Sequence, residues 1–329
     1  MDKIAYFGEN AVIYWNSIVL TLGAMVAICF FLAFYLGKTG NLSAGFAAIP
    51  VALVLSLLAA RFFHWYCRAD SYESFTTAMT DHTTGGYALM GVFLGCFLTA
   101  ALLRLLQLHK NLPEMLDAMA LASCAGIAVG RLASLFNSSD RGNVVSFENL
   151  PFAYPVTNAV SGAVEYRLAT FMIQAMVALV LFVALSLFYL RGNRKGNLRE
   201  GDTTLIFLLI YGSSQVVLDS TRYDSLFFRS NGFVSVVQVL GAVGLAYSIF
   251  RFSRRMVKSR GFRFWQVLLW ILIAAAMGGA GFMEYYVQRR GNEAVFAYSV
   301  MSACLLVIIL LTLLIRLLAV RAERKFAAH

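Results

Sequence analysis

The sequence of 329 residues has little charge: Asp, Glu, Lys and Arg make up 13% of it, whereas hydrophobic residues make up 60%. Soluble domains carry about 25% charged residues because their surface must stay hydrated. The chain also has only four histidines and five cysteines, and no two cysteines have the spacing of a metal site or a redox motif. The composition therefore excludes an ordinary soluble domain, and we expect neither a metal nor a cofactor.

The first 35 residues lack the basic start and the small-residue cleavage site of a secretory signal peptide. They contain instead the first of nine apolar runs, each close to the roughly 20 residues that a helix needs to cross a membrane. The runs lie at 11–35, 44–67, 85–107, 115–137, 166–190, 203–220, 232–252, 263–283 and 295–319. We therefore predict an all-α integral membrane protein, a polytopic helical bundle.

Lys and Arg fall in alternate connections between these runs and in the C-terminal tail, which the positive-inside rule assigns to the cytoplasm. The intervening connections contain more Asp and Glu, so we expect them on the outer side, together with the N-terminus. The formal net charge of +10 is spread over these connections and does not form one patch with aromatic residues. Nucleic acid is therefore not an expected partner.

Two stretches differ from the apolar runs. Segment 138–165 contains Pro151, Pro155 and several aromatic residues, which is typical of a loop at the lipid interface. Stretch 251–260 is strongly basic and precedes the last two apolar runs. We therefore divide the chain into a membrane domain, 1–255, and an addition, 256–329, that consists of a basic loop and two helices.

Ionisable residues are costly inside a membrane, at about 2.5–3.5 kcal/mol each, and therefore mark candidate sites. Arg61 and His64 are three residues apart near the outer end of the second run, so they share a helix face. The alternative is that Arg61 extends to the membrane surface. Gly85 and Gly86 open the third run, where they allow close approach of a lipid headgroup or of another helix.

Arg131 lies at the outer end of the fourth run, after a stripe of small residues that favours tight helix packing. Its planar set of donors suits a phosphodiester, with Ser134 and Asn137 as further donors three and six residues later. The alternative is again an arginine that extends to the membrane surface.

Four polar residues follow one another along the sixth run with spacings of four, four and three, which places them on one helix face. They are Tyr211, Gln215, Asp219 and Arg222. The alternative is a local pair between Asp219 and Arg222. All four motifs fall in the outer leaflet of the predicted topology, where we expect a lipid-handling site.

These residues resemble the prolipoprotein diacylglyceryl transferase family over roughly residues 12–250. The matching landmarks are Ala60-Arg61-Phe-Phe, Gly85-Gly86, Asp117, Gly130-Arg131-Leu, Asn137, Tyr211-Gly, Asp219, Arg222 and Ser235-Val-Val-Gln238. The resemblance implies a seven-helix transferase-like core, here followed by about two extra helices, in the bacterial inner membrane. It also implies transfer of a diacylglyceryl group from phosphatidylglycerol to the lipobox cysteine thiol of a prolipoprotein signal peptide.

The resemblance assigns phosphate binding to Arg131, places Asp219 at the position of a family glutamate, and aligns Arg222 with a second family arginine. Met90 stands where the family has a histidine, and Gln215 stands where it has an arginine. Loss of a proton-transfer group typically lowers a rate by about 10² to 10⁴. We therefore expect either that His64 or His82 supplies the base, or that the chain is a silent lipid-binding relative or a transferase with an altered lipid or acceptor.

The predicted site thus contains two sets of residues. The catalytic set is Arg131, Asp219, Arg222 and His64, and the substrate-binding set is Arg61, Gly85, Gly86, Ser134, Asn137, Tyr211 and Gln215. Phosphatidylglycerol, the prolipoprotein and membrane lipids are the expected partners.

Overall fold

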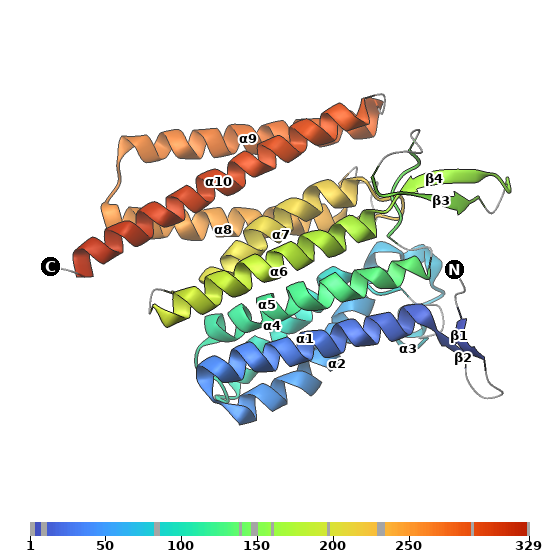
Figure 1. Ribbon diagram of the computed structural model, residues 1–329, viewed down its shortest axis with the longest axis horizontal. Coiled ribbons are helices and arrows are strands. Elements are labelled where there is room, and N and C mark those ends of the chain that lie inside the picture. The colour runs from blue at the N-terminus through green and yellow to red at the C-terminus, as the bar shows by residue number, and fades with distance from the viewer. Residues whose placement is uncertain are drawn as a thin grey trace. The chain divides into compact units, whose positions relative to one another are not determined.

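A computed structural model describes residues 4–7, 12–81, 86–137, 140–145, 151–158, 161–195, 198–228, 234–290 and 293–327. Ten α-helices account for most of these residues (Figure 1). They are α1 (Trp15–Thr39), α2 (Leu42–Cys67), α3 (Phe75–Thr80), α4 (Leu89–Leu105), α5 (Leu112–Gly130), α6 (Thr170–Arg194), α7 (Asp202–Ser220), α8 (Val236–Arg260), α9 (Phe264–Arg290) and α10 (Ala294–Ala327). Two short 3₁₀ helices, η1 (Ala69–Ser71) and η2 (Arg131–Leu135), follow α2 and α5.

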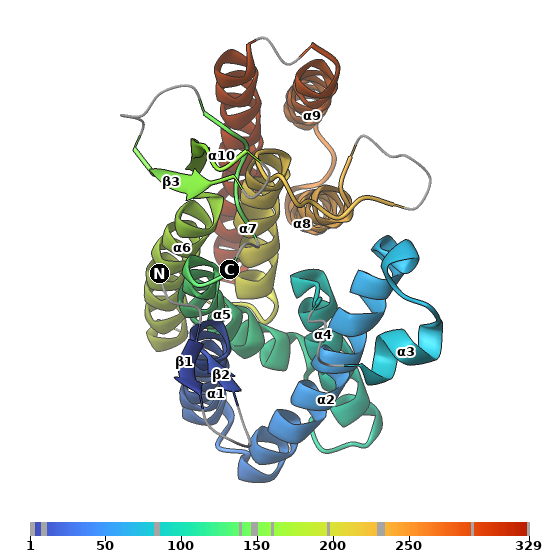
Figure 2. The same cartoon turned by 90° about the vertical axis from the view of Figure 1, so that its right-hand side faces the viewer.

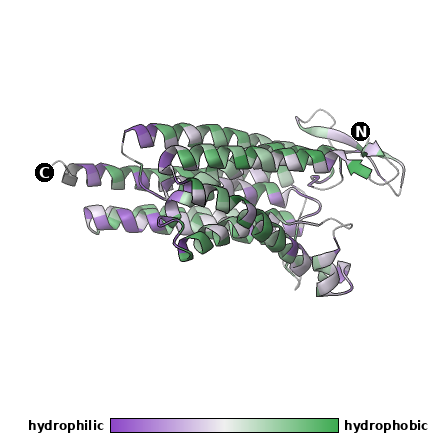
Figure 3. Cartoon of the chain, turned by 90° about the horizontal axis from the view of Figure 1, so that it is seen from below, coloured by the Kyte–Doolittle hydropathy of each residue, from purple (hydrophilic) through white to green (hydrophobic). Residues whose placement is uncertain are grey.

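Within the described residues, eight helices are long and apolar enough to cross a membrane. The helix of the third predicted run, α4, has only 17 residues. Hydrophobic residues dominate the middle of the long helices, and hydrophilic residues gather toward their ends (Figure 3). The prediction of a polytopic helical membrane protein is confirmed.

Two β-hairpins lie outside the long helices. β1 (Ile4–Phe7) pairs with β2 (Val12–Tyr14), and β3 (Ala153–Thr157) pairs with β4 (Val164–Leu168), both antiparallel. The second hairpin begins within segment 138–165, for which we expected a loop, and extends to Leu168. Pro155 hides the strand character of β3 in the sequence, although proline is tolerated on an edge strand.

The chain forms two compact units, and the first consists of Met1–Phe207 and Thr221–Asn231. In this unit α1 packs along α5, and α2 packs along α4 (Figures 1 and 2). Both crossings use glycines. A Cβ atom on Gly91 would lie 2.3 Å from the Ala60 backbone, and one on Gly23 would lie 3.0 Å from the carbonyl oxygen of Gly126. The small-residue stripe of α5 therefore packs tightly, as predicted.

The second unit consists of Leu208–Ser220 and Gly232–His329. Gly212 of α7 faces Gly241 of α8, and a Cβ atom on Gly241 would lie 2.8 Å from the Gly212 carbonyl oxygen. Arg255 of α8 forms two hydrogen bonds with Glu323 of α10, at 2.9 and 2.7 Å. The division into 1–255 and 256–329 stays a prediction.

Candidate functional site

Two arginines of the first unit share one carboxylate. Arg131 is the first residue of η2, and its Nη1 lies 2.7 Å from Oδ1 of Asp140. Arg222 follows α7, and its Nη2 lies 2.7 Å from the same oxygen. Arginines 91 residues apart in the chain are therefore brought together by Asp140, a residue that was not among the predicted site residues.

The surroundings of Asp140 complete a largely buried charged cluster, made of Arg131, Asp140, Arg222 and Asp224, with side chains that are 12%, 16%, 11% and 29% exposed. The hydroxyl of Ser134 donates a hydrogen bond of 3.0 Å to Oδ2 of Asp140. The Asp140 main-chain N–H donates to Asp224 Oδ2 at 2.8 Å, and Arg222 donates to Asp224 Oδ1 from Nε and Nη2 at 3.1 and 3.0 Å. Two guanidinium groups thus balance two carboxylates.

The electrostatics of the cluster keep Asp140 ionised. Burial alone would raise the pKa of its carboxyl group, but the nearby charges of Arg131 and Arg222 outweigh burial and hold the pKa well below its usual range. The arginine side chains are only 12% and 11% exposed. A guanidinium carries five N–H donors in a planar arrangement, so an arginine pair of this kind suits a phosphate group.

A short backbone frame holds Arg222 against the loop that carries Asp140. Gly142 forms a β-bridge with Arg222, and its N–H donates to the Leu168 carbonyl oxygen at 2.8 Å. A Cβ atom on Gly142 would lie 2.6 Å from that oxygen, so only glycine fits. The main-chain oxygen of Asn137 accepts a hydrogen bond of 3.1 Å from Arg141. Asn137 therefore contacts Arg141, the residue after Asp140, through its main-chain oxygen.

Arg61 binds the backbone of the segment that follows α2. Its side chain is 2% exposed and donates to the carbonyl oxygens of Ala78, Asp81 and Gly86, the last at 3.0 Å. Its guanidinium also lies over the ring of Tyr72, 5.0 Å from the ring centroid. Arg61 therefore folds the chain between α2 and α4 into place, and its predicted contact with substrate stays a prediction.

His64 lies in the same region and pairs with a phenol. Its Nδ1 is 2.8 Å from the Tyr72 hydroxyl. Gly86 has a φ of +85°, and a Cβ atom there would meet His64 Nδ1 at 2.7 Å and the Tyr72 hydroxyl at 2.8 Å. Glycine is required at this position for both reasons. Gly85 and His82 lie outside the described residues.

The remaining predicted residues belong to the second unit. Tyr211 and Gln215 are buried on α7, where Gln215 Nε2 lies 3.4 Å from the Ser214 hydroxyl. Asp219 is fully buried and accepts a hydrogen bond from Ser235, which also caps α8 through a reciprocal bond with Gln238. The carboxylate of Asp219 thus lies at the N-terminus of α8, where a helix dipole favours negative charge.

One predicted relationship is wrong. Arg222 does not share a helix face with Tyr211, Gln215 and Asp219, because α7 ends at Ser220 and Arg222 lies in the β-bridge with Gly142. The spacing of three after Asp219 suggested a continuing helix. The bridge geometry that ends it depends on Gly142, 80 residues earlier in the chain, which no local pattern reveals.

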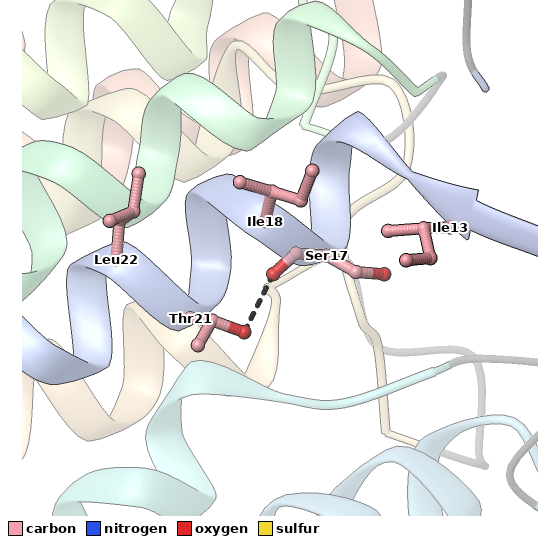
Figure 4. Close-up of a pocket in the computed structure, with 5 residues that line it drawn as sticks. All are labelled: Ile13, Ser17, Ile18, Thr21 and Leu22. Carbon is pink, nitrogen blue, oxygen red and sulfur yellow. Dashed lines mark hydrogen bonds between the residues drawn. The ribbon is translucent and has the colours of Figure 1, made fainter. Parts of the chain in front are cut away.

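A small pocket on α1 offers a different kind of surface (Figure 4). It is lined by Ile13, Ser17, Ile18, Thr21 and Leu22. The Thr21 hydroxyl donates to the Ser17 carbonyl oxygen at 2.8 Å, so this polar group is satisfied within the helix. The pocket contains no ionisable side chain. It suits hydrocarbon and not proton transfer.

Comparison with known proteins gives a consistent result. The family model described as prolipoprotein diacylglyceryl transferase matches residues 4–252. Two proteins named phosphatidylglycerol–prolipoprotein diacylglyceryl transferase are similar to the chain over most of their length. The one from Finegoldia magna is 26% identical over 266 residues, 79% of this chain and 99% of the relative. The one from Bacillus licheniformis is 25% identical over 268 residues, 78% of this chain and 96% of the relative.

Proposed function

Because the chain belongs to the prolipoprotein diacylglyceryl transferase family, we propose that it transfers a diacylglyceryl group from phosphatidylglycerol to the thiol of a prolipoprotein cysteine. The observation that carries this proposal is the family match over 4–252, a range that includes both arginines of the buried cluster. The protein is a multi-pass membrane transferase. Its substrates are a membrane lipid and a membrane-anchored precursor.

At the glyceryl carbon, the reaction forms one bond to sulfur and breaks one bond to oxygen. The cysteine thiol gives up its proton, the sulfur bonds to the glyceryl carbon, and the bond from that carbon to the phosphate oxygen breaks. A thioether forms, and glycerol phosphate leaves with the electron pair of the broken bond. The step needs stabilisation of the phosphate charge and a group that accepts the thiol proton.

Arg131 and Arg222 meet the first need in this proposal. Each arginine is already held by Asp140, so its side chain loses little conformational freedom when a phosphate arrives. Asp140 holds the pair of cations at one place despite their mutual repulsion. Ser134 fixes the second oxygen of Asp140 and therefore acts through it, whereas Asp219 orders the junction of α7 and α8.

The reaction also needs a side chain that accepts the thiol proton. Met90 is buried and cannot exchange a proton, although the family has a histidine there. His64 carries an imidazole, a group that can accept a proton, and its Nδ1 lies 2.8 Å from the Tyr72 hydroxyl. We propose His64 as the group that accepts the thiol proton.

The location follows from the loop charges. We propose that the protein lies in the bacterial inner membrane with its N-terminus outside and its C-terminus in the cytoplasm, since Lys and Arg are enriched in alternate connections. The arginine cluster then faces the outer leaflet. There it meets phosphatidylglycerol and the lipobox of the signal peptide.

A second function is favoured by two specific residues. Met90 and Gln215 replace a histidine and an arginine of the family, and both are buried. A relative without proton transfer would bind phosphatidylglycerol or lipoproteins and turn neither over, and an altered site would take another lipid or acceptor.

Complementation separates these functions. A strain depleted of its own diacylglyceryl transferase receives the wild-type gene or Arg131→Ala, and blotting verifies equal membrane expression. Growth with the wild type alone supports the transferase. No growth despite good expression refutes it and leaves the binding function, which predicts retention of phosphatidylglycerol that Arg131→Ala weakens.

A further inference from the structure

The last helix of the second unit, α10, contacts the end of α7 through Tyr298. Tyr298 lies in the second turn of α10, and its hydroxyl donates a hydrogen bond of 3.0 Å to the main-chain oxygen of Ser220. The Ser220 hydroxyl lies 3.5 Å from the same phenol oxygen. Ser220 is the last residue of α7 and directly follows Asp219.

This contact gives a hydrogen-bond donor to the Ser220 carbonyl, which has no partner within α7. The last four carbonyl groups of an α-helix have no partner within the helix, and a buried carbonyl without a donor is costly. Ser220 is buried, so its carbonyl needs a donor from elsewhere. The Tyr298 hydroxyl supplies that donor from a helix that lies beyond residue 252, the end of the family match.

The end of α7 is also fixed from α8. Ser235 donates to the Asp219 carboxylate, and Gln238 Nε2 donates to the Val216 carbonyl oxygen at 2.9 Å. Tyr298 adds the next anchor along the chain, one residue after Asp219. Helix α10 therefore helps to hold Asp219 and Ser220, the last two residues of α7.

We infer that Tyr298 is a positioning residue of the transferase, and that α10 takes part in the enzyme's function through this contact. The inference rests on the proposed function. Tyr298 acts through the main chain at Ser220: it sets the end of α7, and with it the placement of Asp219 against the N-terminus of α8.

The test compares two tyrosines in the full-length protein, reconstituted with phosphatidylglycerol vesicles and a lipobox peptide. Tyr298→Phe removes only the hydroxyl. The matched control is Tyr247→Phe on α8, whose exposed hydroxyl accepts a bond of 3.3 Å from Arg251. We expect Tyr298→Phe to lower kcat about tenfold, the factor that loss of one such hydrogen bond allows. KM for phosphatidylglycerol stays within error of the wild type, and Tyr247→Phe stays at wild-type kcat. The unfolding midpoint of Tyr298→Phe falls slightly, because the Ser220 carbonyl loses its donor, so kcat is compared at a temperature where both variants are fully folded.

Hydrogen exchange at the end of α7 gives a readout that does not need turnover. Tyr298→Phe speeds amide exchange there, and Tyr247→Phe does not. Wild-type kcat in Tyr298→Phe overturns the inference, as does an equal loss in both variants or unchanged exchange. Absence of turnover in the wild type refutes the proposed function instead, and the exchange data then decide on the Tyr298 contact alone.

Discussion

Arg131 and Asp140, nine residues apart in the chain, form an ion pair of 2.7 Å. The same Asp140 oxygen holds Arg222 at 2.7 Å. The shared carboxylate of Asp140 therefore explains how the guanidinium groups of Arg131 and Arg222 can lie close together. It also makes Asp140 the residue on which the geometry of the cluster depends.

Replacement of Asp140 tests this dependence. Asp140→Asn leaves the two largely buried guanidinium groups without their shared anion, while Asp224 still pairs with Arg222. Loss of one partner of a fully buried ion pair typically costs about 3–5 kcal/mol, so we expect the free energy of unfolding to fall by less than this. We also expect loss of transferase activity, and we measure the two effects by denaturant unfolding and by peptide lipidation. Glu165→Gln is the control, because Glu165 pairs with Arg167 nearer the surface. An equal loss in both variants would contradict the special role of Asp140.

The contribution of Asp140 to the stability of the fold should decrease at low pH. The folded pKa of Asp140 is depressed, so its contribution is fully present above the unfolded pKa of about 3.9 and is lost as pH falls below it. We expect the difference in unfolding midpoint between wild type and Asp140→Asn to be constant from pH 8 to pH 5. It should shrink below pH 4. A difference that already shrinks between pH 7 and pH 6 would show that Asp140 is not held ionised.

The glycine contact between α7 and α8 gives a packing test. A Cβ atom on Gly241 would lie 2.8 Å from the Gly212 backbone, so Gly241→Ala forces the helices apart and should cost about 1–3 kcal/mol. Gly278→Ala is the control in the same unit, since nothing lies within 4 Å of its added Cβ atom. We expect the control to be neutral or slightly stabilising, because alanine favours the helix. Thermal unfolding in detergent compares the two, and equal midpoints would refute the close crossing.

Arg61 can be tested for a structural role. A lysine keeps the charge but cannot serve three carbonyl oxygens in one plane, so Arg61→Lys should loosen the chain between α2 and α4. We expect faster protease cleavage and faster amide exchange in residues 69–81. Arg68→Ala, an exposed arginine at the end of α2, is the control. If Arg61→Lys impairs lipid binding and leaves this segment protected, Arg61 binds substrate instead.

The helices were predictable from the sequence because spanning a membrane requires long apolar runs, and each predicted run contains a helix. The phosphate-binding roles of Arg131 and Ser134 stay predictions, but the structure brings both residues to Asp140. Asp140 could not be predicted, since its role depends on Arg222, 82 residues later. The substrate contact of Arg61 also stays a prediction, and its hydrogen bonds to the carbonyls of Ala78 and Gly86 had no local signal in the sequence.

The hairpin formed by β3 and β4 shows the same limit. Its strand pairing joins Ala153 to Leu168, and Gly142 then pairs with Leu168 and Arg222. Each of these contacts links residues far apart in the chain, so hydropathy and spacing do not reveal them. Tertiary contacts, and not local patterns, set the geometry of the arginine cluster.

The most direct measurement incubates the purified protein in phosphatidylglycerol vesicles with a lipobox peptide and follows the peptide mass. We expect a mass gain of one diacylglyceryl group on the cysteine and release of an equal amount of glycerol phosphate, both absent with Arg131→Ala. An unchanged peptide, with folded protein that retains bound phosphatidylglycerol, would contradict transferase activity.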